Sequence, residues 1–157
     1  MNVGDIVCME LILFKNGVDH YSKYGRPCLY IGEKNGIMYF VPLMSLKKKY
    51  KNLSCHIEPD KDNKLRKTSV LNLRTIIEKR PQFFGVDGHI DDFKMEDIMK
   101  TIVAYFKKVS DEQSKIVKSI AEEYLNERKE IVKDLATMIL DKYGIEYVDS
   151  DIKNKIK

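Results

Sequence analysis

Residues 28–41, CLYIGEKNGIMYFV, carry the clearest structural signal in the first half of the chain. Two runs rich in β-favouring residues, Cys28–Ile31 and Ile37–Val41, flank the dipeptide Asn35-Gly36. Asn-Gly between such runs is typical of a type I′ hairpin turn, because both central residues must adopt positive φ. Pro42 is expected to end the second strand or to place it at a sheet edge. The stretch therefore predicts a two-stranded antiparallel hairpin.

Further strands are expected on both sides of this hairpin. Residues 4–11 predict a first strand, and the polar and glycine-containing residues 15–27 predict a long loop. Residues 53–58 and 68–77 predict two more strands around a polar turn at 59–67. No segment of helical length separates these strands. The first 80 residues therefore predict a mostly antiparallel sheet closed into a small barrel.

The pattern changes to helical periodicity after Gly88. Asp91 or Asp92 can cap a helix that runs to about residue 109, and Ser110-Asp-Glu-Gln113 is a capping-box start for a second helix. The apolar positions expected in the core are Phe93, Ile98, Ile102, Tyr105 or Phe106, and a further stripe from Ile116 to Ile139. This stripe is interrupted at 126–130, so two helices or one long bent helix both fit. Gly144 is expected to stop the helix, and residues 145–148 could form a closing strand.

The sequence thus predicts an α+β protein of one domain, residues 1–157. Residues 1–80 form the barrel core and residues 91–145 the helical region. Residues 150–157 form a short basic tail whose composition fits disorder.

Charge is distributed unevenly over these two parts. Residues 15–80 carry 15 Lys/Arg against 6 Asp/Glu, whereas residues 81–157 carry 13 against 16. The net charge of +4 therefore conceals a basic, β-rich half. A basic β-rich unit indicates a polyanionic partner, most simply RNA or DNA.

Composition also bears on location and cofactors. The three cysteines, Cys8, Cys28 and Cys55, stand singly and predict reduced, buried thiols in a cytoplasmic protein. The histidines are scattered and no Cys-x-x-Cys is present, so neither a metal nor another cofactor is expected. No apolar run reaches the length of a membrane span, and the N-terminus does not read as a signal peptide.

Several short motifs follow one another in the first half. Gly4-Asp5-Ile6-Val7 opens it, Gly25-Arg26-Pro27 precedes a strand, Val41-Pro42-Leu43-Met44-Ser45 ends the next strand, and Thr68-Ser69-Val70 leads into Leu73-Arg74-Thr75-Ile76. Over roughly residues 3–80 this order resembles the MazF/PemK (Kid) family of toxin ribonucleases. The lysine-rich loop after Ser45, the stretches Leu53-Ser54-Cys55 and Leu71–Arg74, and the helical region bring it closer to the type III toxins ToxN, AbiQ, CptN and TenpN.

The resemblance implies a small SH3-like (MazF-type) antiparallel β-barrel with a C-terminal helical region. It also implies the toxin of a type III toxin–antitoxin system, a metal-independent endoribonuclease acting on single-stranded RNA such as target mRNA. In that reaction the 2′-hydroxyl attacks the adjacent phosphorus, leaving a 2′,3′-cyclic phosphate and a 5′-hydroxyl. The inhibitor would be a structured antitoxin RNA that the toxin cuts from a repeat precursor. Toxin and RNA would assemble into a protein–RNA hetero-oligomer.

Arg26 and Ser45 are the first candidates for a catalytic site. The Arg26 guanidinium can hold two phosphate oxygens, and Pro27 fixes the backbone beside it. Ser45 offers a hydroxyl at a strand end. The resemblance adds a Tyr and a Lys from the stretch before Arg26, namely Lys23 with either Tyr21 or Tyr24. Each of these residues also has a structural reading, as a surface ion pair, a turn residue or a solvated side chain. The family's Thr is Met44 here, which cannot donate a hydrogen bond to phosphate.

A run of lysines after Ser45 predicts phosphate contacts. Lys47, Lys48, Lys49 and Lys51 would add affinity and salt dependence rather than base specificity, and Tyr50 could stack on a base. Arg66, Lys67 and Arg74 would extend this track. A solvated charge run is the plainer reading of the same lysines. His56 could act as an acid or base, although a lone histidine in a strand is more often structural.

Two other functions fit the same residues. One is a type II MazF/PemK-like toxin held by an acidic protein antitoxin. The other is a non-catalytic RNA- or DNA-binding barrel, which Met44 in place of Thr favours. The helical region and the basic barrel favour the type III reading over the first of these.

Overall fold

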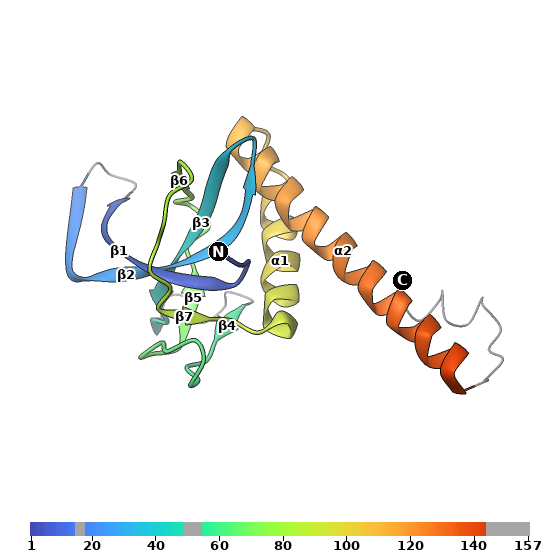
Figure 1. The fold of residues 1–157 in the computed structure, drawn as a ribbon. Coiled ribbons are helices and arrows are strands. Elements are labelled where there is room, and N and C mark those ends of the chain that lie inside the picture. Colours follow the sequence, from blue (N-terminus) through green and yellow to red (C-terminus); the bar gives the residue numbers. More distant parts are fainter. Residues whose placement is uncertain (15–17, 49–54, 144–157) are drawn as a thin grey trace.

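The computed structural model describes residues 1–14, 18–48 and 55–143, with the side chains of all of these except 10–24 and 143. The fold is α+β, with a curled antiparallel half-barrel sheet covered on one face by two helices (Figure 1). The elements are β1 (Asp5–Phe14), β2 (Val18–Lys34), β3 (Ile37–Ser45), β4 (His56–Ile57), β5 (Ser69–Leu71), β6 (Ile77–Lys79), β7 (Gly88–His89), α1 (Asp92–Phe106) and α2 (Glu112–Tyr143).

The strands follow the order β4-β5-β3-β2-β1-β7, and all their pairings are antiparallel. β6 lies off this path and pairs with the first half of β3, whereas β5 pairs with its second half. β3 therefore has different partners along its length within the curled sheet. Antiparallel pairing and a C-terminal helical region were both expected from the sequence.

The β2–β3 hairpin forms as predicted. Asn35 and Gly36 have φ of 54° and 74°, and Lys34 pairs with Ile37 across the turn. The expectation for Pro42 was wrong, because β3 continues through it to Ser45. Pro42 lacks an N–H, but its carbonyl accepts a hydrogen bond of 2.8 Å from the Asn72 N–H, so the strand continues without that donor.

Other predictions for the sheet need correction. Residues 18–27, expected as part of a loop, belong to β2 and pair with β1. The single strand expected at 68–77 is split into β5 and β6 by a turn at 72–76. β7 was not predicted at all. Of the strand expected at 53–58, only His56–Ile57 is extended, and residues 53 and 54 lie outside the described residues.

The helices agree with the sequence more closely. Asp91 caps α1, where its carboxylate accepts a hydrogen bond from the Lys94 N–H. The cap of α2 is Asp111 rather than Ser110, since Asp111 accepts bonds from both the N–H and the hydroxyl of Ser114. α2 is one continuous helix, which settles the alternative left open by the interrupted stripe. Its end is described to Tyr143, so Gly144, the possible strand at 145–148 and the tail lie outside the described residues.

The sheet is buried on both faces. One face packs with α1 and the first half of α2 around Leu29, Val41, Ile98, Ile102 and Val117. The other face holds a smaller cluster, closed by Phe84 against Phe40. Burial raises the pKa of the Cys28 thiol to about 12, and it also raises the pKa of Cys55, so both thiols stay protonated at neutral pH.

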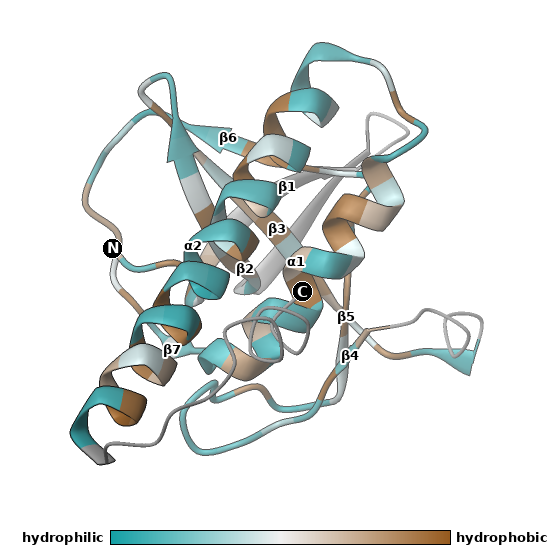
Figure 2. Ribbon diagram, turned by 90° about the vertical axis from the view of Figure 1, so that its right-hand side faces the viewer, coloured by the Kyte–Doolittle hydropathy of each residue, from teal (hydrophilic) through white to brown (hydrophobic). Residues whose placement is uncertain are grey.

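Not every apolar helical residue reaches this core. Phe93, predicted to be buried, is 81% exposed, and the second half of α2 exposes Ile131, Leu135 and Met138. Figure 2 shows apolar segments recurring along α2 as far as its C-terminal end. None of the described helices combines the length and apolarity that a bilayer span requires.

Candidate functional site

A groove of about 770 Å³ is lined by residues of β1, β2 and β3 and of loop 58–68. This loop lies at the end of the sheet away from the β2–β3 turn (Figure 1). Within the described chain, the lining of the groove contains five basic residues and one acidic residue. These are Arg26, Lys47, Lys64, Arg66, Lys67 and Asp87. Its size is within the usual range of ligand sites, and its charge favours an anion.

β1 and β2 position Arg26. It pairs with Met9, and Pro27 pairs with Cys8 on the same two strands. The register shifts just beyond this point, between Met9 and Leu11. Such irregularities re-aim nearby side chains, and Arg26 is part-buried in the groove wall.

The end of β3 positions Ser45, which is exposed at the groove. Ser45 pairs with Ser69, and the Leu46 N–H donates to the Thr68 carbonyl at 2.8 Å, so this strand end is held by β5. The Ser69 hydroxyl donates to the Lys67 carbonyl and the Thr68 hydroxyl to Glu58. Among the described residues, the Ser45 hydroxyl has no such partner and can meet a ligand.

Asn63 organises the loop that carries the other cations. It is 4% exposed, and its side-chain oxygen accepts hydrogen bonds of 3.0 Å from the N–H groups of Asp60 and Leu65. Its side-chain nitrogen donates to the Glu58 carbonyl at 2.8 Å. These bonds fix the loop without a helix or a strand, and the loop thereby presents Lys64, Arg66 and Lys67 to the groove.

β7 anchors this loop to the sheet. The His89 N–H donates to the Asp62 carbonyl at 2.9 Å. Gly88 packs so closely on the loop that a Cβ there would collide with the Asn63 carbonyl. The close approach therefore requires glycine at this position.

Asp87 stands just before β7 and is bonded twice to β1. Its N–H donates to the Ile6 carbonyl, and its carboxylate accepts from the Cys8 N–H, both at 2.8 Å. Cys8 itself is exposed, which corrects the prediction that all three thiols are buried. Partial burial raises the pKa of the Cys8 thiol, and the Asp87 carboxylate raises it further, while Arg66 acts in the opposite direction.

The structure brings together five of the residues singled out in the sequence, namely Arg26, Ser45, Lys47, Arg66 and Lys67. Lys48 is exposed beside Lys47 without lining the groove, and Arg74 is exposed in the turn between β5 and β6, away from the lining. Tyr21, Lys23 and Tyr24 lie on β2, but their side chains are outside the described part, as are Lys49, Tyr50 and Lys51 altogether.

Sequence reasoning missed Cys8, Asn63, Lys64 and Asp87 as groove residues. For Lys64 the signal was its place in a basic segment with Arg66 and Lys67. For Asp87 no local signal existed, since its position depends on pairing between β1 and β7. His56 does not line the groove, and its Nε2 is buried without a partner among the described residues. No group of three or more His, Cys, Asp or Glu residues in the described ranges could hold a metal ion.

No protein-family model matches the chain, and no curated protein matches it at a significant level.

Proposed function

We propose that this protein is a metal-independent endoribonuclease that cuts single-stranded RNA in the cationic groove. Its place would be that of the toxin in a type III toxin–antitoxin pair, on a barrel of MazF type. A structured antitoxin RNA, which the enzyme also processes, would occupy the same groove and join protomers into a protein–RNA assembly.

The observation that carries the proposal is the convergence of Arg26 and Ser45 with four further cations in one groove. The two residues come from different strands, β2 and β3, and are held by separate strand pairings. An RNA phosphodiester needs a donor fork for its non-bridging oxygens, and a hydroxyl that adds a further hydrogen bond. Arg26 and Ser45 supply these two groups.

Cleavage by the substrate's own 2′-hydroxyl requires few further groups from the protein. The groove must align the 2′-oxygen, phosphorus and leaving oxygen, and stabilise the charge that grows on the phosphoryl oxygens. Lys47, Lys64, Arg66 and Lys67 line the groove where they can hold the flanking phosphates. These contacts give affinity and register rather than base specificity.

The test is cleavage of single-stranded RNA by the purified protein in EDTA. We expect products with a 2′,3′-cyclic phosphate and a 5′-hydroxyl. Arg26→Ala and Ser45→Ala should each lower the cleavage rate at least about 100-fold while the protein stays folded. Glu130→Gln, on the exposed second half of α2, is the matched control and should cut like the wild type. Full activity in both groove variants would remove Arg26 and Ser45 from the site.

One observation favours a second candidate, a non-catalytic RNA-binding barrel. Met44, which replaces the hydroxyl residue of the MazF-like pattern, also lines the groove beside Ser45. A thioether stabilises no developing negative charge, so the groove would then hold RNA without cutting it. Salt-sensitive RNA binding with no cleavage in either EDTA or magnesium would support this candidate over the first.

A further inference from the structure

Asp87 is the single carboxylate among the described residues that line the groove. A negative charge weakens the binding of an anion such as RNA, so a carboxylate in this groove needs a functional explanation. We infer that Asp87 is the general base that takes the proton from the attacking 2′-hydroxyl, an inference that rests on the proposed ribonuclease function.

The position of Asp87 is fixed relative to Arg26. Its carboxylate accepts the Cys8 N–H of β1, and Cys8 pairs with Pro27, the neighbour of Arg26 on β2. Asp87 and Arg26 therefore lie on opposite sides of β1. Because Gly88 pairs with Ile6 and Arg26 with Met9, their backbones are two strand spacings apart across the sheet and two residues apart along it, roughly 12 Å in all. Side chains that enter the groove from both sides can contact the ribose and the phosphate of one nucleotide.

Few of the other residues that line the groove can accept a proton from the 2′-hydroxyl. Lysine and arginine are protonated near neutral pH as residue types, and burial raises the pKa of the Cys8 thiol. Neither described histidine, His56 or His89, lines the groove. Carboxylates are ionised near neutrality, and a positioned one can accept a proton as the 2′-oxygen approaches phosphorus.

The step balances without another reactant. The O2′–H proton passes to Asp87 while the O2′–P bond forms and the P–O5′ bond breaks. The leaving 5′-oxygen takes a proton from water, and Asp87 returns its own proton to the solvent after the product departs. Arg26 and Ser45 hold the phosphoryl oxygens throughout.

Asp87 also has a structural role, because it satisfies a backbone donor of β1. Asp87→Asn separates the two roles. The amide oxygen of asparagine can still accept the Cys8 N–H, whereas the amide cannot take the 2′-proton. The fold should therefore survive, and its thermal midpoint should stay close to that of the wild type.

The experiment compares wild type, Asp87→Asn and the control Glu130→Gln on one RNA in EDTA. The single-turnover rate constant at saturating protein should fall about 10²- to 10⁴-fold in Asp87→Asn alone. Binding is measured on the same RNA with a 2′-deoxyribose at the cut position. Its Kd should stay equal or become lower, because the groove loses a negative charge.

Each other result decides against the inference. If Asp87→Asn cuts as fast as the wild type, Asp87 is not the base and the proposed function stands. A rate loss matched by an equal loss of affinity for the deoxy-substituted RNA would make Asp87 a binding or structural residue. If the wild type does not cut RNA, the proposed function and this inference fail together.

Discussion

The groove and the helical layer are held by different kinds of interaction. Around the groove, loop 58–68 has its position set by polar contacts, above all the hydrogen bonds of Asn63 and the His89 N–H bond to Asp62. In the helical layer, α1 and the first half of α2 are placed by burial of residues such as Ile98, Ile102 and Val117. Polar contacts fix where charges point, whereas apolar burial supplies most of the stability.

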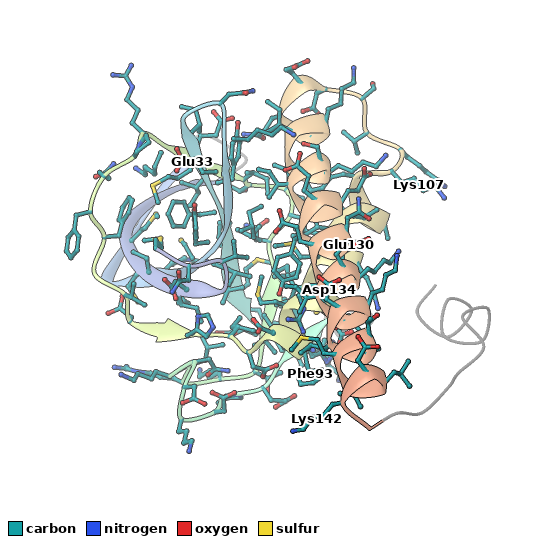
Figure 3. The ribbon with its side chains drawn as sticks, turned by 45° about the vertical axis from the view of Figure 1, so that its right-hand side comes forward. Glu33, Phe93, Lys107, Glu130, Asp134 and Lys142 are labelled. Atoms are coloured by element: carbon teal, nitrogen blue, oxygen red, sulfur yellow. The ribbon has the colours of Figure 1, made fainter. Side chains whose placement is uncertain are left out.

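The helical layer itself changes character along α2. Its first half packs on α1 and β2, and Lys34 ties β2 to it through bonds of 2.8 Å to Ser119 and Glu123. The Arg128 guanidinium lies 3.6 Å from the Asp92 carboxylate at the start of α1. Beyond Arg128, α2 continues past this end of α1. In Figure 3, Phe93 marks that start of α1, and Glu130, Asp134 and Lys142 mark the second half of α2.

The largest effect that separates these regions is expected from the helical core. Ile102→Ala removes a side chain that is 0% exposed and should cost about 2–5 kcal/mol of unfolding free energy. Leu135→Ala, at a site that is 53% exposed, should change it by only about 0.5 kcal/mol. Urea unfolding of the two variants measures both.

An equal loss in the two variants would contradict this difference. It would mean that the second half of α2 is packed in solution as tightly as the first.

A smaller effect is expected where the groove loop meets the sheet. Gly88→Ala pushes a methyl group against the Asn63 carbonyl and should cost about 1–3 kcal/mol through overpacking. RNA affinity should fall with it, because the loop carries Lys64, Arg66 and Lys67. Gly85→Ala is the control, since nothing lies within 4 Å of the added methyl. Thermal unfolding and RNA binding that leave Gly88→Ala and Gly85→Ala alike would refute the close packing.

The features that the sequence predicted correctly are local. The Asn35-Gly36 turn and the Asp91 cap depend on residues within four positions of one another, so their patterns suffice. At residues 18–27, Gly25 and the polar residues indicated a loop. The stretch is a strand instead, because β1 supplies a partner for its backbone hydrogen bonds. Apolar periodicity placed Leu135 on one face of a helix, but it could not tell whether another element covers that face.

The same distinction applies to the candidate site. Arg26 and Ser45 were singled out by residue type and motif. Their strands, β2 and β3, pair as a hairpin, and the sequence predicted that hairpin. Asn63 and Asp87 line the groove, and Gly88 packs against Asn63, through contacts between β1, β7 and loop 58–68 that join residues far apart in sequence. No pattern within one segment reports such contacts.

Charge removal at the groove should alter binding with little effect on stability. Replacing Lys64, Arg66 and Lys67 by Gln should make the negative slope of log K against log salt shallower by about 0.7 per lost phosphate contact with single-stranded RNA, or by about 2 in total. Lys100, Lys107 and Lys108, exposed on and just after α1, provide a matched triple replacement. The slope of that control should not change. Equal slopes in the two triple variants would place the RNA elsewhere.

The smallest effect is expected at the cap of α2, far from the groove in sequence. Hydrogen bonds from the Ser114 hydroxyl and N–H lower the pKa of the Asp111 carboxyl. Because the pKa is lower in the folded state, the ionised carboxyl stabilises the fold at pH values above its unfolded-state pKa. This stabilisation is lost as the pH falls through the folded-state pKa. Ser114→Ala should therefore raise the pKa of Asp111 and weaken the loss of stability in acid that this group causes. Thr137→Ala, on the exposed second half of α2, leaves the cap intact and should move neither quantity. Carboxyl titration by NMR, with the thermal midpoint followed down to acid pH, measures both, and an unchanged Asp111 titration in Ser114→Ala would refute the cap.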